Sequence, residues 1–408
     1  MLKGKHILVG ISGGIAAYKI PELIRLLRKA GAEVRVATTK NALEFVTELT
    51  LQTLSGYKVY SDVFAAINEH STEHISLPDW ADLMVVAPAT ANVLGKMAHG
   101  IADDALTTTF CAMRKPVVVA PAMNDKMYLC PATQEAIRQL SQWDNITMLD
   151  CAAGELACGT IGKGRMQEVT IIASAIEYAL TPKTLTGKHV LVTAGPTEES
   201  IDPVRYISNA SSGKMGYALA KACLRRGAKV TLVSGPTALD MKDWATFTPL
   251  EFVRVRSAQE MCEATTKAFE HADIGILCAA VADFTPSQTA TQKIKKQPGQ
   301  SSLMLTLQTT QDIAALLGKR KTDRQILVGF ALETNNELSN ATHKMVSKNL
   351  DMIVLNSLQD AGAGFGVDTN KVTLLHPDGS RHPIPLSSKD VVADAIIDAI
   401  EDPPSPEK

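Results

Sequence analysis

The sequence predicts an α/β protein with two Rossmann-like domains, each with a mainly parallel sheet flanked by helices. Apolar runs bounded by turn residues alternate with helical patterns, which is typical of parallel strands covered by helices on both faces. The same order of segments also occurs twice. GKHILVGISGG (4–14) corresponds to GKHVLVTAGPT (187–197), and WADLMVVAPATAN (80–92) corresponds to HADIGILCAAVAD (271–283). Each half of the chain therefore contains the strands of one such domain.

This repeat sets the predicted domain boundaries. We expect a first domain over residues 1–180, a linker over 181–187 and a second domain over 188–408. The linker sequence TPKTLTG contains Pro and has no apolar periodicity, as is usual for a connecting segment. A chain of 408 residues is long enough for two or three domains.

One segment of the first domain leaves two alternatives open. Pro21 lies inside ISGGIAAYKIPELIRLLRKAG (11–31), which carries the pattern of the first helix. Either the helix begins near Gly14 and loses a hydrogen bond at Pro21, or it restarts with Pro21 at its first position.

Composition limits the partners that we expect. The chain is 45% hydrophobic and 21% charged, with a net charge of −2, so charge gives no reason to expect binding to nucleic acid or to an anionic membrane. No apolar run approaches the ~18–20 residues of a spanning helix. The N-terminus is interpreted as a strand and turn rather than a signal peptide. We therefore expect a cytoplasmic protein that acts on small molecules.

Small or hydroxylated residues follow three strands of the first domain: Ser12-Gly13-Gly14, Thr38-Thr39 and residues 88–92. Ligands of open α/β sheets bind beyond the carboxyl ends of the strands, and small residues let backbone N–H groups approach a phosphate. The spacing differs from G-x-G-x-x-G, which argues against a standard NAD site. Tight turns that require glycine are the alternative interpretation.

Two further side chains of this half are candidates from their positions. PAMNDKMY (121–128) follows the apolar run KPVVVA and places Asn124 at a strand end, where its amide can bind a ligand's amide or carboxylate. His74, in EHISL, precedes another strand. A simple turn and an ordinary surface or core histidine are the alternatives.

The seven cysteines are scattered, and two of them lie in MLDCAAGELACGTIGKGRM (148–166). The spacing between Cys151 and Cys158, without neighbouring histidines, is a poor pattern for zinc, and reduced thiols are expected in the cytosol. Glycines 159, 162 and 164 favour an exposed loop that carries Cys158.

Taken together, the motifs of the first half resemble the flavin-dependent cysteine decarboxylases. They are SGGIAAYK (12–19), EHISL (73–77), APATAN (87–92), GIADDALTT (100–108), PAMNxxM (121–127) and ACGxIGxGRM (157–166). The order and spacing resemble the bacterial bifunctional family that joins phosphopantothenoylcysteine decarboxylase to phosphopantothenate–cysteine ligase. The resemblance covers essentially the whole chain.

The resemblance implies roles for residues of the first half. It implies an active-site histidine at His74 and a proton donor in a flexible lid at Cys158. Asn124 and Met127 would hold the carboxylate end of the substrate. The family's ACGD is Ala-Cys-Gly-Thr here, which leaves the role of Thr160 open. The implied FMN-binding residues are Ser12, Gly13, Thr39, Ala89 and Thr90.

The decarboxylation explains why a flavin is implied. Loss of CO₂ leaves electrons on a carbon that has no acceptor in a plain cysteine. Oxidation of the terminal CH₂–SH to a thioaldehyde by the flavin supplies that acceptor. The resulting ene-thiolate then takes back a hydride from the reduced flavin and a proton from an acid, for which a thiol in a closed lid is suited.

In the second half, Ser211-Ser212-Gly213-Lys214 precedes a helical pattern whose free N–H groups could meet a phosphate. This is not a Walker loop, since the G-x-x-x-x-G-K-[ST] pattern fails. KIKK (293–296) lies between polar, Pro-containing segments that indicate a mobile loop, and a solvated charge run is the alternative.

The second half resembles the ligase of the same family. The matching segments are TAGPT (193–197), DPVRYISNASSGKMG (202–216), AAVAD (279–283), KIKK, VGFALETNN (328–336) and KNLD (348–351). The resemblance implies that CTP, with Mg²⁺, activates phosphopantothenate as an acyl-cytidylate, whose CMP is displaced by the amine of cysteine.

The resemblance also implies roles for residues of the second half. Lys293 would be a mobile active-site lysine. Asn209 would be the asparagine that the acyl-cytidylate intermediate needs, and Arg205 lies in the same matching segment. Ala279 and Ala280 would leave room for the nucleotide. The family's N-P-D-I is Thr-Gln-Asp-Ile here, which keeps Asp312 and Ile313. The implied nucleotide contacts are Asp283, Phe330, Lys344 and Lys348.

Two rival interpretations remain open at this point. A two-domain oxidoreductase or nucleotide-sugar transferase would explain the architecture but not PAMN, the cysteine loop or KIKK. A non-catalytic flavoprotein would be expected to lack His74 or Cys158, and both are present. The family resemblance implies a homo-oligomer built from trimers through the flavin half and dimers through the ligase half.

Overall fold

The structure is a computed structural model that divides into two compact units, Met1–Pro182 and Lys183–Lys408. The division falls inside the segment expected as a linker. Leu185 of that segment is buried, and its N–H donates a 2.9 Å hydrogen bond to the carbonyl of Arg226, so the end of the segment packs on the second unit. The described residues are 2–64, 73–155, 159, 161–296, 298, 301–333, 335–357, 362–364 and 366–402.

The first unit contains a five-stranded parallel sheet with the order β2-β1-β3-β4-β5. Its strands are β1 (His6–Ile11), β2 (Glu33–Thr38), β3 (Leu83–Ala89), β4 (Val117–Pro121) and β5 (Ile146–Met148). Its helices are η1 (Ile15–Lys19), α1 (Ile20–Lys29), η2 (Lys40–Glu44), α2 (Glu48–Ser55), α3 (Glu73–Trp80), α4 (Ala91–His99), α5 (Ala105–Ala112), α6 (Asp125–Tyr128), α7 (Pro131–Ser141) and α8 (Val169–Leu180). A hairpin of β6 (Ala152–Glu155) and β7 (Ile161–Arg165) lies outside this sheet.

Both faces of this sheet are buried. Leu8, Met84 and Val119 join one core cluster with Leu106 and Leu140, which come from α5 and α7. Neighbouring strand residues point to the opposite face, on which α8 packs against β3 and β4. Burial of both faces explains why the strands are continuous apolar runs, as expected for a parallel sheet.

The structure favours the second alternative for the helix around Pro21. A 3₁₀ turn, η1, ends at Lys19, and α1 begins at Ile20, so that Pro21 lies in the first turn of the α-helix. An N–H has no intrahelical acceptor there, and proline therefore costs nothing at this position.

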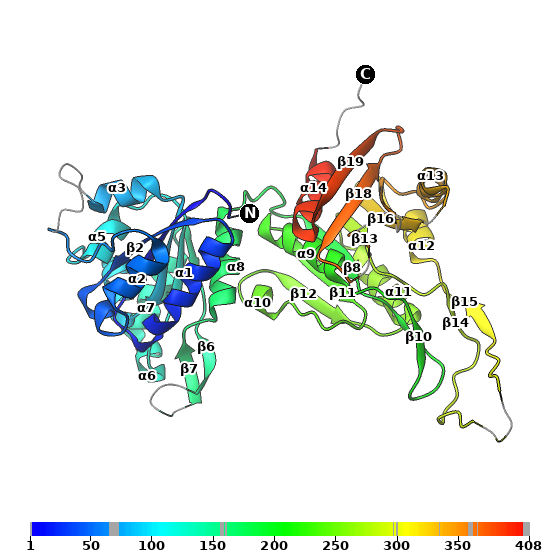
Figure 1. Cartoon of the computed structure of the whole chain (residues 1–408), viewed down its shortest axis with the longest axis horizontal. Helices are drawn as coiled ribbons and strands as arrows, with labels where there is room; N and C mark the ends of the chain where they lie inside the picture. The colour runs from blue at the N-terminus through cyan, green and yellow to red at the C-terminus, as the bar shows by residue number, and fades with distance from the viewer. Residues whose placement is uncertain are drawn as a thin grey trace. The chain divides into compact units, whose positions relative to one another are not determined.

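The second unit contains an eight-stranded sheet with the order β12-β11-β8-β13-β16-β17-β18-β19 (Figure 1). Pairing is parallel from β12 to β17, and β18 and β19 add antiparallel. The strands are β8 (His189–Ala194), β11 (Lys229–Ser234), β12 (Leu250–Arg254), β13 (Ile274–Leu277), β16 (Ile326–Glu333), β17 (Met352–Ser357), β18 (Thr369–Leu375) and β19 (Arg381–Ser388). The helices are α9 (Lys214–Arg225), α10 (Lys242–Ala245), α11 (Ala258–Phe269), α12 (Ile313–Arg320), α13 (Glu337–Ser347) and α14 (Lys389–Glu401).

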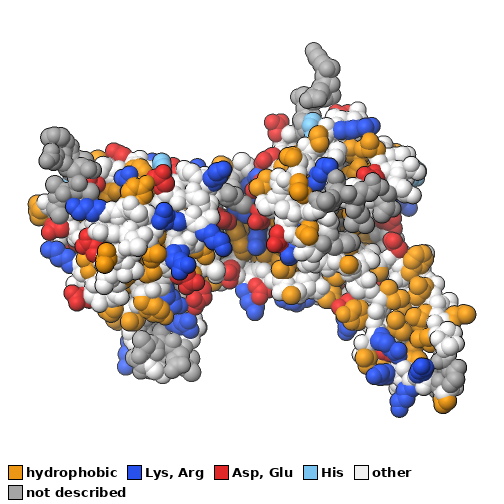
Figure 2. Space-filling model, viewed as in Figure 1, with side chains coloured by type: hydrophobic (Ala, Val, Ile, Leu, Met, Phe, Trp, Pro, Cys, Tyr) orange, Lys and Arg blue, Asp and Glu red, His pale blue; other side chains and the backbone are white. Residues whose placement is uncertain are grey.

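Two small antiparallel ribbons extend from this unit. One pairs β9 (Glu198–Ser200) with β10 (Tyr206–Ser208), and the other pairs β14 (Phe284–Pro286) with β15 (Leu307–Thr309). The second ribbon and its loop form an arm with apolar side chains on its surface (Figure 2). Its exposed large apolar residues are Phe284, Leu303, Met304, Leu305 and Leu307.

The two corresponding segments 80–92 and 271–283 each contain an Ala-Asp pair, Ala81-Asp82 and Ala272-Asp273, and the structure shows what the aspartate does. The backbone N–H of His6, at the start of β1, donates a 2.8 Å hydrogen bond to Oδ2 of Asp82, and the N–H of Asp82 donates to the carbonyl of His6. Asp273 makes the same pair of hydrogen bonds with His189, at the start of β8. In both units the aspartate therefore fixes the amino end of the first strand against the strand that follows it in the sheet.

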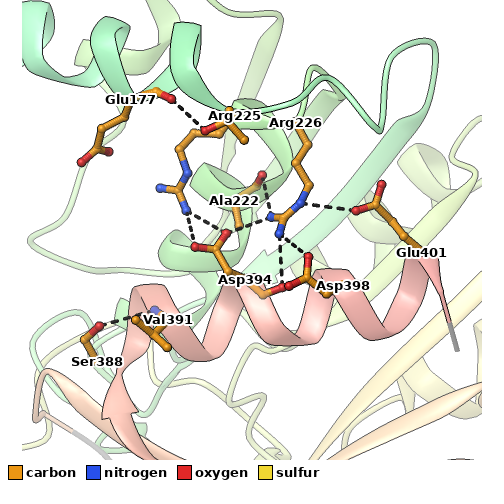
Figure 3. A network of polar contacts seen from close by, with 10 residues as sticks. Glu177, Ala222, Arg225, Arg226, Ser388, Val391, Asp394, Asp398 and Glu401 are labelled. Carbon is orange, nitrogen blue, oxygen red and sulfur yellow. Dashed lines mark hydrogen bonds and ion pairs between the residues drawn. The ribbon is translucent and has the colours of Figure 1, made fainter. Parts of the chain in front are cut away.

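A polar network joins α9 to α14 (Figure 3). Arg225 is only 1% exposed and donates to Asp394 at 3.1 Å. Arg226 donates to Asp394 at 2.9 Å and to Asp398 at 2.6 Å, and it lies 3.3 Å from Glu401. Buried arginines with several carboxylate partners fix the register of two packed helices. The first residues of both helices, Lys214 and Lys389, lie at the cavity described below.

Candidate active sites

The first unit has a cavity of about 1080 Å³ at the carboxyl edge of its sheet. It is lined by segments that follow β1, β2, β3 and β4, and by the end of β7 with the residue after it. This is the edge at which open α/β sheets bind ligands. The lining segments include residues 13–19, 39–41, 61–64, 122–124 and 164–166.

The residues expected to bind a flavin divide into two groups. Gly13, Thr39 and Thr90 line the cavity, whereas Ser12 and Ala89 are fully buried beside it. The hydroxyl of Ser12 donates to the carbonyl of Pro88 at 2.7 Å and accepts from the N–H of Thr90 at 3.1 Å. The side chain of Ser12 therefore joins the ends of β1 and β3 and does not point into the cavity.

Two features of this cavity fit a bound flavin nucleotide. A Cβ atom on Gly13 would lie 2.5 Å from Cβ of Asn41, so the close approach of the two turns requires glycine. The hydroxyl oxygen of Thr39 is buried and has no hydrogen-bond partner in the described part of the chain. A buried polar atom at a cavity wall normally has a partner, and a ligand that offers hydrogen-bonding groups would supply one.

Asn124 and Met127 both line this cavity. Asn124 is the N-cap of α6, and its Oδ1 accepts a 2.9 Å hydrogen bond from the N–H of Lys126. Because the carbonyl oxygen of the amide is held by the backbone, the orientation of the Asn124 side chain is fixed. Met127 is 49% exposed, which is high for an apolar residue at a cavity wall.

The base of the β6–β7 hairpin packs closely on the segment around Asn124. The N–H of Met123 donates to the carbonyl of Gly164 at 2.9 Å, and a Cβ on Gly164 would lie 2.3 Å from the carbonyl oxygen of Met123. Tyr128 and Lys163 both contact the carboxylate of Asp150, through a 2.7 Å hydrogen bond and an ion pair. Burial raises the pKa of Asp150, but these two contacts outweigh burial and lower that pKa below its ordinary value.

Three other expectations for the first half have different outcomes. Cys158 and Thr160 lie outside the described residues. Cys151 is buried, its thiol contacts the carbonyl of Pro121, and burial raises its pKa to about 12, so it is a structural cysteine. His74 is half-buried in α3 and is not among the described residues that line the cavity.

The second unit has a cavity of about 650 Å³ beyond the carboxyl ends of β8, β13, β16 and β17. Most of the residues expected here do line it, and Arg205 and Lys293 do not. Those that line it are Asn209, Ala279, Ala280, Asp283, Asp312, Ile313, Phe330, Lys344 and Lys348.

Side chains fix the backbone after β13 at this cavity. Nδ2 of Asn209 donates to the carbonyl of Ala280 at 3.0 Å. The hydroxyl of Thr193 accepts from the N–H of Ala279 at 3.1 Å, and the hydroxyl of Thr197 accepts from the N–H of Ala282 at 3.0 Å. The small side chains of Ala279 and Ala280 thus lie on a backbone that is held in place before any ligand binds.

Two lysines of this cavity are paired with carboxylates. Lys344 lies 2.6 Å from Glu333, and Lys348 lies 2.9 Å from Asp312. Asp312 also caps α12 by accepting from the N–H of Ala315. Burial raises the pKa of Asp312, while that N–H and the Lys348 ammonium outweigh burial and lower the pKa.

Asp202 holds Arg205 near Lys293. The carboxylate of Asp202 is buried and accepts hydrogen bonds from Nε of Arg205 at 3.0 Å and from the N–H of Ile294 at 3.1 Å. Nη2 of Arg205 also donates to the carbonyl of Ile294 at 2.7 Å. The arginine therefore holds the loop backbone at Ile294, next to Lys293, whose side chain is exposed.

Some cavity residues were not found by reasoning from the sequence. Lys389, Cys278 and Asn356 all line the second cavity, and Oδ1 of Asn356 is buried without a partner among the described residues. Lys389 is a single lysine after two serines, so no sequence pattern identified it. Within the described residues, no group of three metal-ligating side chains occurs, and no helix is long and apolar enough to cross a membrane.

Comparison with known proteins assigns both halves of the chain. Residues 1–181 match the family model described as Flavoprotein, and residues 185–403 match the DNA/pantothenate metabolism flavoprotein C-terminal domain. The chain is 47% identical over 403 residues to the coenzyme A biosynthesis bifunctional protein CoaBC of Bacillus subtilis, an alignment that covers 98% of this chain and 97% of the relative.

Two other similarities concern parts of the chain. A cysteine/cysteine sulfinic acid decarboxylase from an unknown prokaryotic organism is 47% identical over 357 residues, which cover 86% of this chain and 98% of the relative. The crystal structure of the C-terminal domain of a CoaBC protein is 41% identical and covers 54% of this chain and 96% of that one, with a TM-score of 0.45.

Proposed function

The chain belongs to the family of the coenzyme A biosynthesis bifunctional protein CoaBC, and from this premise we propose that its two cavities are the sites of the family's two reactions. The protein is a bifunctional enzyme of coenzyme A biosynthesis, with a flavoprotein decarboxylase domain and a ligase domain. The observation that carries this conclusion is the 47% identity to CoaBC over 98% of the chain. We assign the decarboxylase to residues 1–180 and the ligase to residues 188–408.

In the proposed ligase reaction, CTP with Mg²⁺ binds in the second cavity. The carboxylate of 4′-phosphopantothenate attacks the α-phosphorus, forms an acyl-cytidylate and releases pyrophosphate, and the amine of cysteine then displaces CMP. Lys344 and Lys348 line this cavity and contact the nucleotide. The Asn209 amide fixes the Ala280 carbonyl beside the reacting acyl group. Lys293, on its exposed loop, approaches the leaving pyrophosphate.

We assign the remaining predicted ligase residues the roles that the family resemblance implies. Ala279 and Ala280 leave space for the nucleotide, and Phe330 offers a ring against it. Asp283, Asp312 and Ile313 also line this cavity, and we assign them to nucleotide binding. Arg205 acts through its hydrogen bonds to Asp202 and Ile294, which hold the loop that carries Lys293.

In the proposed decarboxylase reaction, FMN is held in the first cavity by Gly13, Thr39 and Thr90, with Ser12 and Ala89 shaping the wall behind them. FMN, when bound, supplies the reversible two-electron oxidation that makes loss of CO₂ from a cysteine carboxylate feasible. Asn124 and Met127 hold the carboxylate end of phosphopantothenoylcysteine. Cys158 donates the proton that completes 4′-phosphopantetheine.

We propose that the sites are completed by oligomerisation. His74 is absent from the described lining of the first cavity, which fits a histidine that serves the site of another copy in a trimer. The apolar arm of the second unit, with Met304 93% exposed, fits a contact between ligase halves in a dimer (Figure 2). Mixing inactive His74→Asn and Asn124→Ala proteins tests the first point, because shared sites regain activity in hybrids and separate sites do not.

A second function is favoured by one similarity. The relative described as a cysteine/cysteine sulfinic acid decarboxylase suggests a first domain that acts on free cysteine. Two observations support the bifunctional assignment instead: the match to the ligase family over residues 185–403, and the residues that line the second cavity.

A coupled assay tests the proposed function directly. Purified protein is supplied with phosphopantothenate, cysteine, CTP and Mg²⁺, and pyrophosphate, CMP and CO₂ are measured. The proposal predicts all three products and a yellow FMN spectrum. Colourless protein that cannot be reconstituted with FMN, or equal turnover with ATP in place of CTP, would contradict it.

A further inference from the structure

The two ends of the second cavity differ in how their lysines are neutralised. At the end formed by α12 and α13, Lys344 and Lys348 each face a carboxylate within 3 Å, namely Glu333 at 2.6 Å and Asp312 at 2.9 Å. At the end formed by the first residues of α9 and α14, two other lysines line the cavity, and within the described residues only one of them pairs with a carboxylate.

Lys389 is the lysine without a carboxylate partner among the described residues. It is 7% exposed, and its ammonium donates to the carbonyls of Gly364 at 3.1 Å and Val367 at 2.5 Å. A carbonyl carries only a partial charge, and the carboxylate of Asp368 attracts this ammonium without contacting it, so its charge is only partly compensated. Burial, and then the charge of Lys214, lower the pKa of Lys389.

Lys214 lies beside it and holds the same turn. Its ammonium donates to the carbonyl of Gly366 at 2.9 Å and pairs with Asp368 at 2.6 Å. The side chain of Asp368 is 88% exposed, so solvent weakens that pairing. Cys278 also lines the cavity, but burial raises its pKa to about 12, so it stays neutral and supplies no counter-charge.

The α9–α14 packing keeps the two lysines together. Each is the first residue of its helix, and the buried Arg225 and Arg226 network with Asp394 and Asp398 fixes one helix against the other (Figure 3). Two ammonium groups held at one end of a cavity, with one exposed carboxylate between them, form a site for a multiply charged anion.

We propose that Lys389 and Lys214 together bind a phosphate group of a ligase substrate, at the end of the cavity opposite Lys344 and Lys348. This inference rests on the proposed ligase function. Two sources of that phosphate exist among the substrates, the triphosphate of CTP and the 4′-phosphate of phosphopantothenate. The binding chemistry is the same for both.

The test measures dissociation constants for paired ligands that differ in phosphate. Lys389→Met removes the charge and keeps an unbranched side chain of similar length, and Lys242→Met, at an 84% exposed side chain of the same unit, is the matched control. Loss of one charge-assisted hydrogen bond weakens binding by about tenfold or more. A triphosphate site predicts that loss for CTP and less than about twofold for CMP. A site for the other substrate predicts the loss for phosphopantothenate and not for pantothenate.

Other outcomes overturn the inference. Equal weakening of all four ligands would show that Lys389 only supports the fold, and unchanged affinities would show that it binds no phosphate. Lys214→Met, at a side chain that is one-third exposed, must give the same pattern and decides the matter if the Lys389 variant does not fold. Failure of the proposed function itself is distinguishable, since the wild-type protein would then release no pyrophosphate from CTP.

Discussion

The hydroxyl of Tyr128 donates a 2.7 Å hydrogen bond to Oδ1 of Asp150, and this contact connects the helix that Asn124 caps to the segment that leads into the β6–β7 hairpin. Tyr128 ends the short helix that Asn124 caps, and Asp150 precedes the hairpin whose second strand carries Lys163. Lys163 forms an ion pair with the same Asp150 carboxylate. The position of the hairpin base is thus coupled to that of the residues proposed to hold the substrate carboxylate.

Substitution of Asp150 is therefore expected to impair decarboxylation without removing the flavin. Asp150→Asn loses the ion pair with Lys163, at a cost of about 1 kcal/mol in the free energy of unfolding, and loosens the hairpin base. We expect kcat for phosphopantothenoylcysteine to fall about tenfold, with FMN content unchanged. Asp144→Asn, at an exposed position of the same domain, is the control. Equal kcat values in the two variants would argue against the coupling.

Gly164→Ala should destabilise the flavin domain at the base of the β6–β7 hairpin. Its Cβ would lie 2.3 Å from the carbonyl oxygen of Met123, a backbone atom that cannot move aside by changing rotamer. We expect a loss of about 1–3 kcal/mol in the free energy of unfolding of the flavin domain, together with weaker substrate binding. Gly95→Ala is the matched control, because a Cβ at this position of α4 meets no heavy atom within 4 Å. Urea unfolding followed by flavin fluorescence measures the free energy of unfolding of both variants.

Gly13→Ala should act on the cofactor. The added methyl group meets Cβ of Asn41 at 2.5 Å, which forces apart the turns after β1 and β2 at the cavity wall. Purified Gly13→Ala protein is expected to contain less than about a tenth of the FMN of the wild type, measured by absorbance at the flavin band. Full FMN occupancy of this variant would remove Gly13 from the proposed site.

Acid should weaken the second domain through Asp202. The hydrogen bonds from Arg205, and then those from backbone N–H groups, lower the pKa of this carboxyl well below its ordinary value, although burial opposes them. The unfolded value is about 3.9, so the stabilisation by Asp202 is complete at pH values above that and is lost as the pH falls through the folded pKa. The difference in unfolding free energy between wild type and Asp202→Asn should therefore be largest near neutral pH and shrink in acid. A difference that is constant across this range would contradict the assignment.

The strands and their mainly parallel pairing were predictable from the sequence because burial on both faces leaves a continuous apolar run. The Ala-Asp repeat was visible too, but its role as a clamp on His6 and His189 depends on pairing between strands about eighty residues apart. The end of the expected linker packs on the second unit because Leu185 finds a buried position there.

The cavities were less predictable than the strands. Glycines and small residues at strand ends pointed to the first cavity, since the geometry of a parallel sheet brings those ends together. The segment 211–214, before a helical pattern, pointed to the second cavity. Arg205 was expected at the second cavity but does not line it. Its hydrogen bonds go to the buried Asp202 and to Ile294 of the loop that carries Lys293. Lys389 was not found, since a lone lysine after two serines has no distinguishing pattern, and only the packing of α14 on α9 brings it to the cavity.

The origin of the released carbon dioxide tests the central claim most directly. The wild-type protein is given phosphopantothenate, CTP, Mg²⁺ and cysteine labelled with ¹⁴C at its carboxyl carbon, and labelled CO₂ is compared with CMP. Two reactions in sequence predict equal amounts of the two products and no labelled gas when CTP is omitted. Labelled gas released from cysteine in the absence of CTP would contradict the account, because it would mean that the flavin domain acts on the free amino acid.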